Sequence, residues 1–189
     1  MNALTTTFLF ASILFANACV PSLNPLYTEA DLTMQPTLVG TWVDKETGET
    51  WTFSNCEELK YSLLHVDTDG RTGRYDARLV KVENKLFLDI VPVKSGFTQN
   101  DLFKERFIAT HTFLRIISNE ATVQISYLEP RWLEDQLVEN PGAIKHEKVG
   151  GEIVLTSSPK ETQKFLIAHL DTRGAYSQPT ELTKKGWPK

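Results

Sequence analysis

The chain has 189 residues, of which 41% are hydrophobic and 23% are charged, a balance that fits one globular domain with a substantial core. Its 20 Lys and Arg against 24 Asp and Glu give a net charge of −4, so nucleic-acid binding that relies on excess positive charge is excluded. Two cysteines are too few for a disulfide-dense scaffold, a four-thiolate zinc site or an iron–sulfur cluster.

The amino terminus is uncharged and apolar. No Asp, Glu, Lys or Arg occurs before Glu29, and Phe8–Ala16 is an apolar run of nine residues. A membrane-spanning helix needs about 20 apolar residues, so this run has instead the length of the apolar region in a secretory signal. We expect residues 1–18 to be a signal peptide. Residues 19–36 contain three prolines as well as apolar side chains, and we expect a lipid-anchored spacer that packs partly along the domain.

The lipid anchor is inferred from the motif Ala16-Asn17-Ala18-Cys19, which resembles the lipobox of bacterial lipoproteins. The resemblance implies that the thiol of Cys19 receives a diacylglyceryl group and that the new amino terminus is acylated, for example with palmitate. Several acyl chains would hold a folded domain at the membrane, because one chain alone binds only marginally. Val20 rather than Asp after the cysteine implies delivery to the outer membrane if the cell is Gram-negative. The motif departs from the family at Ala16, where Leu is preferred, and no Lys or Arg precedes the apolar run.

Other interpretations of Cys19 remain open. It could follow a plain cleaved signal, lie in a buried amino-terminal segment, or form a disulfide with Cys56 that would exclude lipidation. If Cys19 is lipidated, Cys56 is expected to be a small buried hydrophobe, as most free cysteines are. Intact-mass measurement separates lipidation from the disulfide.

The mature chain shows mainly the alternation of apolar and polar residues that predicts β-strands. The expected strands cover residues 38–43, 49–53, 60–66, 75–82, 85–91, 111–117, 121–127 and 153–156. A helix is expected over 130–139, because Pro130 suits a first turn and Asn140-Pro141-Gly142 stops it. A second helix is expected from Ser158 to about His169, with Glu161 completing a capping box. The tail, 177–189, is expected to be frayed from Gln178 onwards.

This series of strands, with two short helices in the C-terminal half, predicts a mainly β fold over residues 37–176: an antiparallel barrel or a strongly curved sheet. Gly40-Thr41-Trp42 resembles the Gly-x-Trp signature of lipocalin-type barrels, in which the Trp plugs the closed end, so the resemblance implies a lipocalin-like domain. The helix over 130–139 departs from that family, which has a short turn there. The segment 21–27, followed by Gly40-Thr41-Trp42 and Trp51-Thr52-Phe53, also resembles a group of bacterial lipoproteins without assigned function.

Catalytic signatures are missing from the sequence. It has no Gly-x-Ser-x-Gly elbow, Gly-rich phosphate loop or dinucleotide fingerprint. His146-Glu147 begins like the zinc-protease motif, but Gly150 stands where the second His would be. We therefore expect no catalytic residue, no metal and no cofactor, and a protein that is not an enzyme.

The candidate pocket residues are Trp42, Trp51, Asp89, His111 and Arg115. Asp89 interrupts an apolar run, and His111 and Arg115 alternate with apolar residues. If they point inward they form a polar cluster inside the barrel, which often marks a site because buried charges are costly. We favour the alternative that they occupy the solvated face of a one-sided antiparallel sheet. The two tryptophans either line an apolar pocket or fill the core, and for Trp42 we expect the core.

These observations predict a non-enzymatic, membrane-anchored lipoprotein of the bacterial cell envelope that binds a small apolar ligand or an envelope protein. One alternative is an envelope hydrolase that uses the Asp89, His111 and Arg115 region. A further alternative is a structural envelope-assembly lipoprotein. The barrel interior distinguishes them, because a solid interior counts against an enclosed ligand and an open cleft at the three polar residues favours the hydrolase.

Overall fold

The computed structural model describes residues 19–94, 105 and 107–186, without the side chains of residues 55 and 56. The predicted signal peptide lies outside these residues. The strands are β1 (Pro21–Ser22), β2 (Leu32–Thr33), β3 (Gly40–Asp44), β4 (Thr50–Glu57), β5 (Lys60–Val66), β6 (Thr72–Val82), β7 (Lys85–Pro92), β8 (His111–Ser118), β9 (Thr122–Tyr127), β10 (His146–Val149), β11 (Glu152–Leu155) and β12 (Thr180–Lys184). The helices are the 3-10 turns η1 (Glu29–Asp31) and η2 (Pro36–Leu38) and the α-helices α2 (Pro130–Glu139) and α3 (Pro159–Ala168).

Eight strands close into an antiparallel barrel. Strands β3 to β9 pair consecutively, and β12 completes the circle between β9 and β3. The predicted mainly β fold and its two C-terminal helices are confirmed, and the sheet is a closed barrel rather than an open curved sheet. Closure removes the exposed edges that an open sheet would present.

The strand that closes the barrel lies in the segment that was expected to be a frayed tail. Residues 180–184 form β12, in which Leu182 is opposite Asp44 on one side and Val123 on the other. Leu182 is completely buried. The expectation of a frayed tail is therefore wrong for this segment. One apolar residue among polar ones gives too weak an alternation to predict a strand, and only the two neighbouring strands stabilise it.

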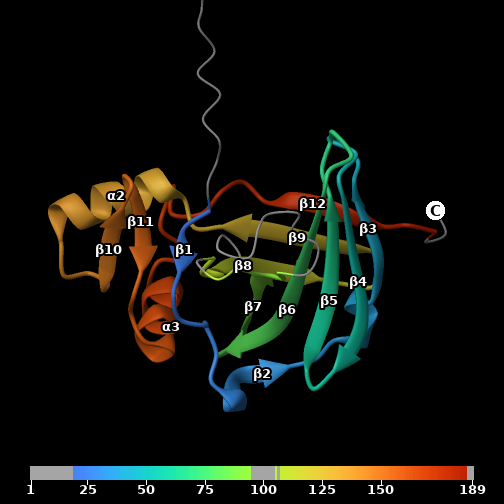
Figure 1. The fold of residues 1–189 in the computed structure, drawn as a ribbon, viewed down its shortest axis with the longest axis horizontal. Coiled ribbons are helices and arrows are strands. Elements are labelled where there is room, and N and C mark those ends of the chain that lie inside the picture. Colours follow the sequence, from blue (N-terminus) through green and yellow to red (C-terminus); the bar gives the residue numbers. More distant parts are fainter. Residues whose placement is uncertain (1–18, 95–104, 106, 187–189) are drawn as a thin grey trace, which may run out of the picture.

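The chain between β9 and β12 forms an insertion on the outer side of the barrel. It contains α2, β10, β11 and α3, which lie together on the left in Figure 1, away from β3 to β6. The predicted capping box is present, because the Ser158 side chain accepts from the amide of Glu161 and the Glu161 carboxylate accepts from the amide of Ser158.

The structure has two hydrophobic cores, one on each side of the wall formed by β6 to β8. Trp42, Leu88 and other inward-facing side chains form the inner core. Phe87 and its outward-facing neighbours form the outer core together with side chains of the insertion and of the amino-terminal segment, among them Phe165 and Leu26. Because β7 is covered on both faces, its sequence is an almost continuous apolar run rather than an alternating one.

The end of the barrel at η2 is closed. Leu38 of η2 is buried, and its carbonyl accepts a 2.7 Å hydrogen bond from Nε1 of Trp42. The amide of Gln35 donates to the Tyr61 hydroxyl at 2.8 Å. The ammonium group of Lys184 lies 5.1 Å from the centre of the Trp42 ring and donates to the carbonyl of Thr37. Trp42 therefore closes the core, as expected from the sequence.

Candidate functional site

The middle of the barrel is filled with side chains. Trp42, Phe53, Leu79 and Leu88 are all at most 1% exposed and belong to one inner cluster. A solid interior of this kind counts against a ligand enclosed at the centre of the barrel. Three inward-facing aromatic side chains that solvent still reaches, Trp51, Tyr75 and Tyr127, lie at the end opposite η2, which we call the open end; Leu86 is partly exposed at the η2 end.

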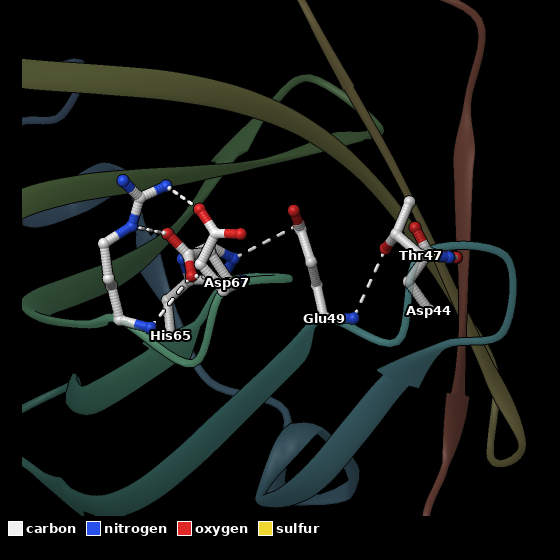
Figure 2. A network of polar contacts seen from close by, with 7 residues as sticks. Asp44, Thr47, Glu49, His65 and Asp67 are labelled. Atoms are coloured by element: carbon white, nitrogen blue, oxygen red, sulfur yellow. Dashed lines mark hydrogen bonds and ion pairs between the residues drawn. The ribbon is translucent and has the colours of Figure 1, made fainter.

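The β3–β4 and β5–β6 turns lie at the open end, where β7 also ends, β8 begins and the insertion starts. Trp51 and His65 are opposite each other on β4 and β5, and their rings make an edge contact with centroids 4.8 Å apart. Nε2 of His65 lies 3.4 Å from a carboxylate oxygen of Glu49. Figure 2 shows this pair between the two turns. All three side chains are partly exposed, so they remain accessible from solution.

Hydrogen bonds within the turns hold this rim in place. The amide of Glu49 donates to the Thr47 hydroxyl at 3.3 Å (Figure 2). Asp44 accepts from the amides of Glu46 and Thr47. Burial by itself raises the pKa of Asp44, but these hydrogen bonds outweigh it and leave the pKa below its usual value. In the β5–β6 turn, Arg71 forms ion pairs with Asp67 at 2.8 Å and Asp69 at 2.7 Å. The two aspartates therefore shape the turn and are paired with an arginine.

Two tyrosines extend the aromatic lining of the open end. Tyr75 is opposite Leu63, and Tyr127 is opposite Leu114; both tyrosines pack against the inner cluster while remaining partly exposed. A Cβ at Gly73 would approach the Tyr75 ring to 2.8 Å, so a larger residue there would displace that ring. Burial raises the pKa of Tyr127, and negative charge at Glu129 and Cys19 adds to the effect.

Asp89 and His111 lie on the other side of the barrel wall. Leu88 and Ile90, which flank Asp89, face the inner cluster, so Asp89 points outward, under the amino-terminal segment. It accepts a 2.8 Å hydrogen bond from the amide of Leu26 and a 2.7 Å bond from Nδ1 of His111. The Asp89 side chain is 1% exposed and that of His111 is 16% exposed. The pair therefore fastens the amino-terminal segment to the barrel.

The five candidate pocket residues do not line one pocket. Trp42 and Trp51 face the interior, whereas Asp89 and His111 face the outer core, because successive residues of a strand alternate between its faces. Arg115 is opposite Phe87 and therefore shares the outward face with Asp89 and His111. The hydrogen bonds to the Asp89 carboxylate come from the Leu26 amide and from His111. We expected Asp89 to lie on a solvated face of the sheet, and this is wrong. The amino-terminal segment covers the outer face of β7 at Asp89, which is 2% exposed.

The sequence did not assign Glu49, His65 and Tyr127 to a site. Strand alternation places Glu49 on the same face as Trp51, and His65 on the same face as Tyr61, so the alternation itself carried a signal. What was missing was the pairing of β4 with β5, which sets His65 opposite Trp51.

Cys19 is a free, partly buried cysteine at the start of the described chain. Burial raises the pKa of its thiol, and the nearby charge of Glu129 adds to the increase. A pocket of about 150 Å³ adjoins it, lined among others by Val20, Pro130 and Ile153. The side chain of Cys56 lies outside the described residues.

No family model, curated protein or solved structure matches this chain.

Within the described parts, no group of three or more His, Cys, Asp or Glu side chains is placed to hold a metal ion. In the same residues, every helix is too short or too polar to cross a lipid bilayer. The fold and geometry are thus those of a closed eight-stranded antiparallel barrel with an aromatic open end.

Proposed function

We propose that the chain is a lipid-anchored, non-enzymatic protein of the bacterial cell envelope, at the outer membrane in a Gram-negative cell, and that the open end of its barrel binds the apolar part of a small ligand. The observation that carries the proposal is the group of partly exposed aromatic side chains, Trp51, Tyr75 and Tyr127, at the one end of the barrel that η2 does not close. Apolar and aromatic lining with few polar groups is typical of small-molecule sites.

Polar groups at the same place would orient the ligand. The Glu49 carboxylate and the His65 ring lie beside Trp51, so a ligand with an apolar body and a hydrogen-bonding end finds both kinds of contact. Because the inner cluster fills the barrel below them, the site is shallow and favours a ligand that inserts only one end.

The anchor is tested by the mass of the full-length chain recovered from bacterial membranes. We expect a diacylglyceryl adduct on Cys19 and loss of residues 1–18 in the wild type, and neither the adduct nor membrane retention in Cys19→Ser. Cys56→Ser is the control and should keep the adduct. An unmodified Cys19 in the membrane-bound wild type would refute the anchor.

Ligand binding is tested by titrating the purified protein with a fluorescent fatty acid. Trp51→Leu should weaken binding roughly tenfold, because a buried aromatic contact contributes about 1–2 kcal/mol and 1.4 kcal/mol corresponds to a factor of ten. Trp132→Leu is the matched control, since Trp132 packs against Phe165 and His169 in the outer core and not among the inward-facing side chains. Equal binding by both variants would refute the site.

A second candidate is the structural envelope-assembly lipoprotein, which the filled barrel interior favours. That function needs an exposed docking face instead of a ligand site. Crosslinking to an envelope protein that persists in Trp51→Leu, together with no binding of the fatty acid to the wild type, would support it over the ligand-binding function.

A further inference from the structure

The predicted lipid attachment residue stands beside the open end of the barrel. Strand β8 begins at that end, and its first residues, His111 and Thr112, pair with Ser22 and Pro21 of β1. Cys19 precedes Pro21 by two residues, which corresponds to about 7 Å at the usual spacing of an extended chain. The effect of Cys19 on the pKa of Tyr127, whose larger cause is burial, agrees with this position.

The segment after Cys19 is fixed to the domain instead of forming a flexible tether. Val20 and Ser22 are buried. Strand β1 pairs antiparallel with β8 and parallel with β11, and the amide of Leu23 donates to the carbonyl of Leu155 at 2.9 Å. A lipid on Cys19 therefore brings the barrel itself, and not a loose linker, up to the membrane.

This attachment distinguishes the two ends of the barrel by distance. Strand β6 has 11 residues, which span roughly 28 Å along the barrel axis at about 3.3 Å per residue and the usual strand tilt of about 40°. The closed end at η2 is thus separated from the open end by most of the thickness of the domain. A membrane at Cys19 lies close to the open end and far from the closed end.

The aromatic side chains at the open end suit a bilayer surface; the turns beside them carry the exposed Glu46 and the ion pairs of Arg71 with Asp67 and Asp69. Trp51, Tyr75 and Tyr127 are partly exposed there, and Trp and Tyr are the residues that gather at membrane–water interfaces. Two aliphatic side chains on this side of the domain are exposed: Ile108, just before β8 at the open end, is 72% exposed, and Val149, at the end of β10 beside its turn to β11, is 62% exposed. Strand β11 is the neighbour of β1, which places that turn beside Cys19.

We propose that the open end of the barrel is the surface that faces the lipid bilayer, with η2 and the closed end pointing away from it. The inference rests on the proposed lipid anchor and extends it, because the ligand site then opens towards membrane lipid. The partner of this surface is the phospholipid headgroup and glycerol region, into which the aromatic side chains and Ile108 would insert.

The test places one fluorophore at each end of the full-length, naturally processed chain in a Cys56→Ser background. Glu46→Cys lies in the β3–β4 turn at the open end, and Asn84→Cys lies in the β6–β7 turn at the closed end; both positions are exposed. The protein is reconstituted into phosphatidylcholine vesicles whose headgroups carry a nitroxide quencher. We expect the label at residue 46 to lose most of its emission and the label at residue 84 to keep it.

Equal quenching at both positions, stronger quenching at residue 84, or no quenching at either overturns the proposed orientation when mass measurement shows the adduct on Cys19. An unmodified Cys19 overturns the proposed anchor, and the orientation with it, so the two failures are distinguishable. If a label disturbs folding, Thr68→Cys in the β5–β6 turn and Glu120→Cys in the β8–β9 turn repeat the comparison, since both side chains are exposed.

Discussion

Asp89→Ala is expected to destabilise the protein far more than Asp76→Ala, although both aspartates lie on the paired strands β6 and β7. Asp89 is buried and accepts hydrogen bonds from the Leu26 amide and from His111. Asp76 is 46% exposed on its side chain and forms an ion pair with Lys60 at 3.2 Å. The comparison therefore separates a buried polar contact from an exposed one within a single hairpin.

The expected loss in the free energy of unfolding depends on which polar groups each substitution leaves without a partner. Asp89→Ala removes the buried acceptor of two hydrogen bonds and leaves two donors without a partner, each of which costs about 1–3 kcal/mol. Breaking an exposed ion pair costs about 0–1 kcal/mol. A loss of about 4 kcal/mol is a large share of the free energy of unfolding of a domain, which is about 5–15 kcal/mol.

Urea denaturation of the chain without residues 1–18, followed by Trp fluorescence, measures both changes. The dependence of the free energy of unfolding on urea concentration should be the same in the wild type and both variants. The change in the midpoint urea concentration then reports the change in stability. Amide hydrogen exchange at Leu26 should accelerate in Asp89→Asn before global unfolding, because its acceptor is weakened. Losses for Asp89→Ala and Asp76→Ala within about 1 kcal/mol of each other would refute the fastening role of Asp89, since a buried pair exceeds an exposed one by more than that.

Three further predictions concern other contacts. Leu182→Ala should lower the free energy of unfolding by about 2–5 kcal/mol in urea denaturation, whereas a change near zero would mean that β12 is not part of the barrel. Trp42→Phe should cost about 1–3 kcal/mol, because the buried carbonyl of Leu38 loses its donor; an unchanged midpoint would contradict the closure described for η2. Burial alone would raise the pKa of Asp31, but hydrogen bonds from Lys160 and from other side chains keep it well below the usual value. Its stabilising contribution is therefore present above about pH 4 and is lost as the pH falls, so Asp31→Asn should flatten the decline in stability between pH 4 and pH 2, and an unaltered pH profile would contradict this.

The strand series was predictable because one face of most strands is buried and the other is not. The interval Lys60–Val66 and the helix Pro130–Glu139 have the predicted boundaries, since alternation, proline and Asn-Pro-Gly signals act locally. Strand β12 was not predictable, because it depends on the hydrogen bonds of β3 and β9.

The candidate site was only partly predictable. The sequence pointed to Trp51 as an inward-facing aromatic residue, but its contact with His65 depends on the register between β4 and β5. Asp89 stands out in the sequence because its charge interrupts an apolar run. Its partner, the Leu26 amide, is 63 residues away in the chain and belongs to a segment without a strong pattern.

The sequence by itself determined a mainly β fold, either an antiparallel barrel or a strongly curved sheet, with two helices, because periodicity is a property of neighbouring residues. Its resemblance to a lipobox marked Cys19 as the candidate anchor. Only the tertiary structure decided which face of each strand is the interior, that the barrel is filled and closed at η2, and that Cys19 stands at its open end. These features depend on pairing between distant segments. A strand with apolar residues on both faces, such as β7, does not reveal which face is inside, because both of its faces are buried.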